Sequence, residues 1–220
     1  VVLPDDVLFL RGAPAGINRL RELAGAPPWE PPQLAEDTAV TDLDRAVDTL
    51  VEMKNISEVS VGLAYSALVL ADRGLAAEVR HLEDRLDEMN DRLELWVLRA
   101  GAQELDPSQL RGLLQLSRAA EDIGDQAQQM VWLVETFDEV HPILRIALGE
   151  SDEVVMHCPV APGSAADGAK LGQLGLEIEP GFSVLAIRRA GRYLYRPRAF
   201  VRLEAGDELI ASGPDEGRPM

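Results

Sequence analysis

Residues 182–213 read FSVLAIRRAGRYLYRPRAFVRLEAGDELIASG, and this stretch decides the fold of the second half of the chain. Its first apolar run, 183–187, is continuous rather than alternating, which predicts a strand covered on both faces. A basic turn around Ala190-Gly191 follows. Pro197 should end the next strand or keep it at an edge, because proline has no N–H to donate. Gly206-Asp207 predicts a turn into a second apolar run. Taken alone, the pattern fits any small α/β domain with a surface hairpin.

The order of these elements resembles the TrkA-C (RCK-C) domain, the C-terminal ligand-binding module of potassium-uptake regulators. The resemblance spans roughly Val154 to Gly213. It implies a module that senses a ligand and reports to a membrane partner, and not an enzyme. The glycines of residues 168–175 have the wrong spacing for a dinucleotide-binding turn and fit the small-residue helix of TrkA-C. We therefore expect the Rossmann half of full-length regulators to be absent.

A short segment near the N-terminus repeats the end of this motif. Residues 5–12, DDVLFLRG, align with residues 206–213, GDELIASG. Such repetition predicts that residues 1–25 are the truncated tail of a preceding TrkA-C-like module, and that the second module is itself cut at its C-terminal end. Chance similarity of a short segment is the alternative. Residues 26–40 are rich in proline and predict a stiff, extended linker.

The chain is strongly acidic, with 38 Asp and Glu, 21 Lys and Arg, and a formal net charge of -17. This charge argues against a nucleic-acid partner, because such binding depends on neutralising phosphates. The low lysine content suits a high-salt cytoplasm such as that of a halophilic archaeon, although a GC-rich genome can also encode an acidic protein. Apolar runs fall short of the roughly 20 residues that a membrane helix needs. A single cysteine, Cys158, favours a reducing cytoplasm.

Residues 41–150 predict three long helices. The first has Thr41 as its N-cap and Gly74 as its stop. The third begins at Asp106-Pro107, a capping residue followed by a proline suited to the first turn. The second carries a heptad seam typical of a helical bundle. Its members are Leu75, Val79, Leu82, Leu86, Met89, Leu93 and Trp96. A three-helix layer leaves an apolar face uncovered, so we expect a homodimer.

These helices resemble a PhoU-type domain through residues 119–127, AAEDIGDQA. Residues 52–58, EMKNISE, followed by residues 63–68, LAYSAL, resemble archaeal two-domain proteins that join a PhoU-like unit to TrkA-C. PhoU proper carries two three-helix repeats, whereas this chain supplies one. The expected fold class is therefore α+β, a long-helix PhoU-like bundle at 41–150 followed by a small α/β TrkA-C domain at 151–220.

The PhoU resemblance implies a divalent metal site at Glu121 and Asp125, which share one helix face. Two carboxylates suffice only if other ligands converge on them, and Glu52, Asn55 and Glu58 on the first helix are the candidates. An acidic helix face without an ion is the alternative. The three histidines, at 81, 141 and 157, have no metal-ligand spacing.

A basic cluster is the second candidate site. Guanidinium groups suit phosphates, and a tyrosine could stack on a base. The predicted ligand-binding residues are Arg188, Arg189, Arg192, Tyr193 and Arg196. The TrkA-C resemblance implies cyclic di-AMP, or another nucleotide, in the cleft between two paired copies. The arginines could instead only pair with the surplus carboxylates of the chain.

No nucleophile–base set or phosphate-binding loop is recognisable, so we predict no catalytic residues and no enzyme. The predicted function is cytoplasmic, ligand-sensing regulation of cation transport, with potassium as the ion and a separate membrane channel or transporter as the partner. The alternatives are a metal-binding PhoU-like adaptor in phosphate signalling and a dimerisation scaffold.

Overall fold

The computed structural model describes residues 14–30, 41–101, 107–137, 153–177 and 181–215. It divides into two compact units, residues 1–39 and 40–220. The first unit contains helix α1, Pro14–Leu23. The repeat proposed at residues 5–12, most of the proline-rich segment, Asp106 and His141 lie outside the described residues. No helix within the described ranges is long and apolar enough to cross a membrane.

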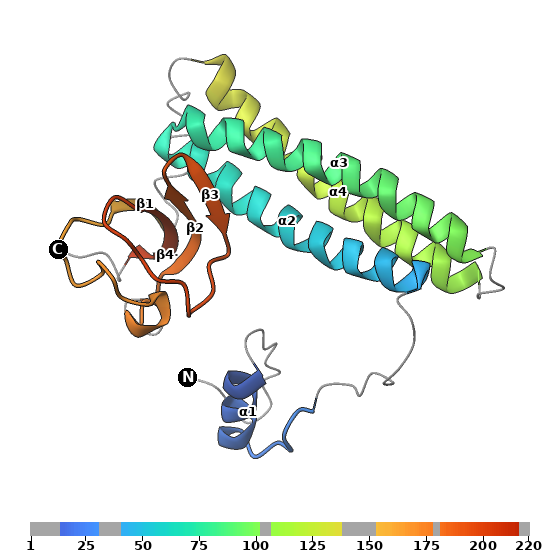
Figure 1. Cartoon of the computed structure of the whole chain (residues 1–220), viewed down its shortest axis with the longest axis horizontal. Helices are drawn as coiled ribbons and strands as arrows, with labels where there is room; N and C mark the ends of the chain where they lie inside the picture. The colour runs from blue at the N-terminus through green and yellow to red at the C-terminus, as the bar shows by residue number, and fades with distance from the viewer. Residues whose placement is uncertain (1–13, 31–40, 102–106, 138–152, 178–180, 216–220) are drawn as a thin grey trace. The chain divides into compact units, whose positions relative to one another are not determined.

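The second unit begins with three long helices, α2 (Asp42–Leu70), α3 (Arg73–Gly101) and α4 (Pro107–Thr136), which pack as a bundle (Figure 1). Thr41 caps α2 as predicted, since its Oγ1 accepts from the Asp44 amide and the Asp44 carboxylate accepts from the Thr41 amide. The three-helix prediction for this half of the chain is confirmed.

The predicted stop of α2 at Gly74 is wrong. The helix ends at Leu70, and Ala71 adopts a left-handed conformation with φ 50°. Asp72 then starts α3, because its Oδ1 accepts from the Gly74 amide at 2.7 Å and from the Leu75 amide at 3.1 Å. A capping aspartate thus begins the second helix where the sequence pattern placed a glycine stop.

The heptad seam of α3 forms the centre of the bundle, and its members from Leu75 to Leu93 are buried. Trp96, the last member, is only partly buried. Two guanidinium groups lie over its ring, that of Arg45 at 4.9 Å and that of Arg99 at 5.1 Å from the ring centroid. The seam therefore ends in a cation–π stack at the surface.

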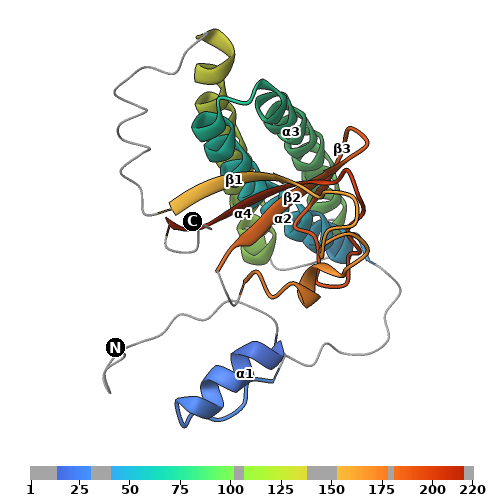
Figure 2. The ribbon, with the colours of Figure 1, turned by 90° about the vertical axis from the view of Figure 1, so that its left-hand side faces the viewer.

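The sheet follows the helices and has four strands, β1 (Glu153–Pro159), β2 (Ser183–Arg189), β3 (Arg192–Tyr195) and β4 (Glu208–Pro214). All neighbours are antiparallel in the order β1-β4-β2-β3 (Figure 2). Between β1 and β2 the small-residue segment forms a 3₁₀ turn, Leu171–Gln173. The fold is α+β, a helical bundle followed by an antiparallel sheet domain.

The β2–β3 hairpin turns at Ala190-Gly191, where both residues have positive φ, 48° and 77°. A two-residue turn of this kind matches the right-handed twist of the flanking strands. The register places Arg188 opposite Tyr193 and Ala186 opposite Tyr195.

The sheet is covered on both faces, as the continuous apolar run predicted. A β-bulge between Val184 and Ala186 places Leu185 and Ala186 in the cluster that the sheet shares with the helices. Val184 and Ile187 belong to a separate cluster on the other face. The bulge thus gives β2 two consecutive side chains directed at the helical bundle, so the sheet and the helices share one core.

Gly213 in β4 provides a test of this packing. A Cβ there would lie 2.8 Å from Cγ of the buried Phe182 ring and 3.0 Å from the Gly181 carbonyl oxygen. We predict that Gly213→Ala lowers the free energy of unfolding by about 1–3 kcal/mol, the usual cost of overpacking, measured by urea denaturation. Gly112→Ala on α4 is the matched control, because a Cβ there meets nothing within 4 Å. Equal destabilisation by both variants, or none by Gly213→Ala, would contradict the packing described.

Candidate ligand-binding site

The end of β3 contacts the helical bundle through two polar side chains. The Tyr195 hydroxyl donates to the Glu78 carboxylate on α3. Arg196 Nη1 donates to Asn55 Oδ1 at 2.7 Å and to Glu58 Oε2 at 2.9 Å, both on α2. Burial raises the pKa of Glu78 above its usual range. These contacts join the sheet to two different helices.

Arg196 has the left-handed backbone conformation, with φ 45°, that non-glycine residues rarely adopt. Its amide donates to the Leu185 carbonyl at 2.9 Å, and its side chain is held by α2. Such backbone strain persists only where surrounding contacts over-determine it. Contacts with the sheet and with α2 therefore both hold this residue in place.

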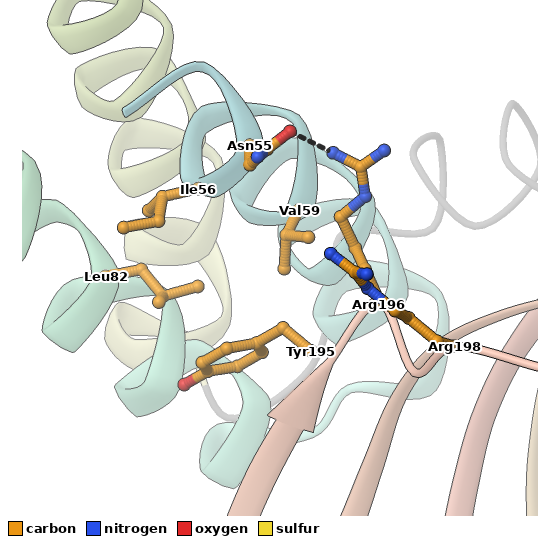
Figure 3. Close-up of a pocket in the computed structure, with 7 residues that line it drawn as sticks. All are labelled: Asn55, Ile56, Val59, Leu82, Tyr195, Arg196 and Arg198. Carbon is orange, nitrogen blue, oxygen red and sulfur yellow. Dashed lines mark hydrogen bonds between the residues drawn. The ribbon is translucent and has the colours of Figure 1, made fainter. Parts of the chain in front are cut away.

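A pocket of about 440 Å³ lies beside these contacts. Residues of α2 and α3 form one part of its wall, and Tyr195 with the segment after β3 forms the other (Figure 3). The lining residues are Asn55, Ile56, Val59, Leu82, Tyr195, Arg196 and Arg198. We call this space the interdomain pocket. Figure 3 shows both arginine side chains reaching from the segment after β3 toward α2.

The predicted ligand residues fall in separate places. Arg188 and Tyr193 lie on the helix-facing side of the sheet, where Arg188 pairs with Glu208. His157 Nε2 contacts the same carboxylate at 2.8 Å. The Tyr193 ring stacks on Tyr195, with centroids 6.4 Å apart, and burial raises the pKa of its hydroxyl.

Arg189 lies on the opposite face and binds Asp207, a carboxylate that is only 1% exposed. Its Nε and Nη2 donate to the two Asp207 oxygens, each at 2.7 Å. Further hydrogen bonds reach the Glu204 carboxylate and the Arg202 carbonyl. The guanidinium hydrogen bonds from Arg189 lower the pKa of Asp207. Four of the five N–H donors of this guanidinium are thus used inside the protein.

Arg192 is exposed at the hairpin tip, and Arg196 lines the interdomain pocket. The five predicted residues therefore do not form a single cluster within one chain, and their joint role in ligand binding stays a prediction. Sequence reasoning missed Ile56, Val59 and Leu82 as pocket residues. Their helical periodicity indicated only core positions.

The predicted metal residues Glu121 and Asp125 lie near Glu83 and Asp87 of α3. Burial, together with the neighbouring Asp87 and Asp125 carboxylates, raises the pKa of Glu83. Burial and Asp125 likewise raise the pKa of Glu121. Among the residues that the structure describes, no group of three or more His, Cys, Asp or Glu side chains is placed to hold a metal ion.

The side chains expected to complete the metal site from the first helix bond to arginines instead. Glu52 pairs with Arg85 at 3.1 Å, while Asn55 and Glu58 accept from Arg196. Metal binding at Glu121 and Asp125 stays a prediction.

Comparison with known proteins identifies both halves of the second unit. The family model of the PhoU domain matches residues 50–134, and that of the TrkA-C domain matches residues 155–218. The chain therefore contains a PhoU domain followed by a TrkA-C domain. Both are regulatory types of domain.

Several solved structures are similar to parts of this chain. The RCK_C domain dimer of S. agalactiae BusR in complex with c-di-AMP is 24% identical, over 28% of this chain and 82% of that chain, with a TM-score of 0.26. The GsuK channel bound to NAD is 22% identical, over 48% and 19%, with a TM-score of 0.29. BusR in complex with its busA-promotor DNA is 17% identical, over 57% and 61%, with a TM-score of 0.27. A search of curated proteins finds no significant match.

The buried Glu83 makes stability depend on pH. Its raised pKa means that the native state holds the proton more tightly than the unfolded chain, so its contribution to stability falls as pH rises above the ordinary value of 4.5. We predict that Glu83→Gln raises Tm at pH 7, because glutamine can still accept from Gln128 Nε2. This gain shrinks as the pH approaches 4.5. Glu88→Gln, an exposed site on the same helix, is the control, and a pH-independent difference for Glu83→Gln would contradict the assignment.

Arg189 provides a test of the sheet domain. We predict that Arg189→Ala lowers the free energy of unfolding by about 1.5–3 kcal/mol, because Asp207 loses its charged hydrogen bonds while it stays buried. Chemical denaturation measures this loss of unfolding free energy. Arg192→Ala is the control, because Arg192 lies opposite Arg189 in the hairpin and is exposed. Equal midpoints for the two variants would show that the pair does not stabilise the sheet.

Proposed function

We propose that this protein is a non-enzymatic, cytoplasmic regulator of cation transport, with potassium as the ion and a separate membrane channel or transporter as its partner. The observation that carries the proposal is the shared core of the TrkA-C sheet and the PhoU helices. Because Leu185 packs beside Gly62 of α2, and Ala186 belongs to the same core cluster as the helices, a ligand-driven shift of the sheet also moves the helices. The regulatory character of both domains supports this function.

The proposed active form is a homodimer in which two TrkA-C domains pair around a nucleotide. Leu194 and Phe200 support this arrangement as large exposed apolar side chains of the TrkA-C domain. Arg192 at the hairpin tip is exposed and has no side-chain partner among the described residues, so its guanidinium is suited to a phosphate. The proposed ligand is cyclic di-AMP or another nucleotide. That the protein has no nucleic-acid partner remains a prediction from its net charge.

Calorimetry and light scattering of the full chain test this proposal. We predict that the protein is a dimer, binds cyclic di-AMP, and loses at least tenfold in affinity on Arg192→Ala. Arg111→Ala on α4 is the control, because it removes an exposed arginine far from the sheet in sequence and leaves the TrkA-C domain unchanged. Hydrogen exchange in α2 and α3 should slow when the ligand binds. Absence of heat with cyclic di-AMP would rule out that ligand, and unchanged exchange in the helices would rule out the coupling.

A metal-binding PhoU-like adaptor is the competing function, and its basis is the nearness of Glu121 and Asp125 to carboxylates of α3, which helps to raise the pKa of Glu83 and Glu121. Elemental analysis of the purified protein decides between the two. Stoichiometric iron or zinc that is lost in a Glu121→Ala, Asp125→Ala variant would favour the adaptor. A scaffold would show neither metal nor nucleotide binding.

A further inference from the structure

We propose that the interdomain pocket binds a small organic phosphate. Its phosphate would lie on Arg196 and Arg198, and its apolar part on the side chains of α2 and α3. This site is separate from the hairpin tip and needs only one copy of the chain. The outcome of a test of this site therefore does not depend on the proposed function.

On the basic side of the pocket, several guanidinium N–H groups donate no hydrogen bond to any described residue. The Arg196 side chain makes two hydrogen bonds, and both come from Nη1. Within the described part of the chain, its Nε and Nη2 donate to no acceptor. The Arg198 side chain makes no hydrogen bond or ion pair with any described residue. Two guanidinium groups with unused donors, beside the Asn55 amide, suit an anion with several acceptor oxygens, and phosphate is such a group.

The other side of the pocket is apolar. Ile56, Val59 and Leu82 are buried core residues whose side chains reach this space, and the Tyr195 ring lies across from Leu82 (Figure 3). Inorganic phosphate would leave this surface uncovered. A volume of about 440 Å³ lies within the range of small-molecule sites, about 300–1,000 Å³. The pocket therefore favours a phosphate that carries an apolar or planar group.

Because the pocket is lined by both domains, a ligand bound in it would hold the sheet domain against the helices. Arg196, Arg198 and Tyr195 belong to the sheet domain, whereas Asn55 and Leu82 belong to the helices. A ligand that contacts both sides stabilises the docked arrangement by mass action. It uses Nε and Nη2 of Arg196, so the hydrogen bonds from Nη1 to Asn55 and Glu58 are kept. The bound phosphate would thus add to the link that Asn55 and Glu58 provide.

Phenyl phosphate is the simplest probe of this site, with inorganic phosphate and phenol as comparison ligands. We expect calorimetry on the full chain to show saturable binding of phenyl phosphate, at least tenfold weaker binding of inorganic phosphate, and no heat with phenol. Arg198→Ala should reduce the affinity for phenyl phosphate at least tenfold. Its ligand-free Tm should equal that of wild type, because Arg198 has no partner among the described residues. Arg111→Ala, which removes an exposed arginine of α4 outside the pocket, should leave the affinity unchanged.

A second variant separates ligand loss from misfolding. In Asn55→Asp the new carboxylate can still accept from Arg196, so the contact with α2 is kept, but it repels a phosphate. Binding of phenyl phosphate should disappear while the fold is retained. The proposal is overturned if wild type shows no saturable binding, if inorganic phosphate binds as tightly as phenyl phosphate, or if both variants bind like wild type. Loss of cyclic di-AMP binding would affect only the proposed function.

Discussion

The docking of β2 and β3 on α2 and α3 is the constraint on which the rest of the second unit depends. A bulge at Leu185 turns two successive side chains toward the helices, and a strictly alternating strand could present only one of them. Leu185 packs beside Gly62 on α2, where a Cβ would lie 3.4 Å from both Leu185 methyl carbons, an ordinary van der Waals contact. The apolar contact brings the end of β3 to the helices, where Tyr195 and Arg196 make their polar contacts and border the pocket.

Arginines neutralise carboxylates at several places in this acidic protein. Arg189 neutralises a carboxylate inside the sheet domain, Arg188 neutralises another on the helix-facing side, and Arg80 pairs with Glu135 between α3 and α4. Arginine suits these roles because its planar group donates several hydrogen bonds in fixed directions. The paired arginines stabilise the structure, whereas Arg198, unpaired within the described residues, and the exposed Arg192 remain suited to a ligand. The basic cluster in the sequence therefore divides into arginines that pair with carboxylates and arginines that we propose bind a ligand.

The fold was largely predictable from local patterns. The heptad seam of α3, the Thr41 cap and the two-residue turn after Arg189 are features in which neighbouring residues determine the conformation. The end of α2 was misplaced because a left-handed Ala71 and a capping Asp72 compete with the nearby Gly74. The candidate site was predicted only in part. Arg196 was recognised by its chemistry, but Ile56, Val59 and Leu82 look like ordinary core positions until the sheet is placed against them.

The sequence by itself determined which segments are helices and strands, which faces are apolar, and that the chain joins a PhoU domain to a TrkA-C domain. Periodicity, caps and turn residues act over a few positions, so they can be recognised without a structure. Only the tertiary structure decided which carboxylate each arginine meets and where a cavity remains. Those partners are far apart in the chain, as Arg196 and Asn55 are, and their approach depends on how two packed surfaces fit. The resemblance in residues 182–213 predicted a sensor, and the structure showed which of its arginines pair with carboxylates of the described residues.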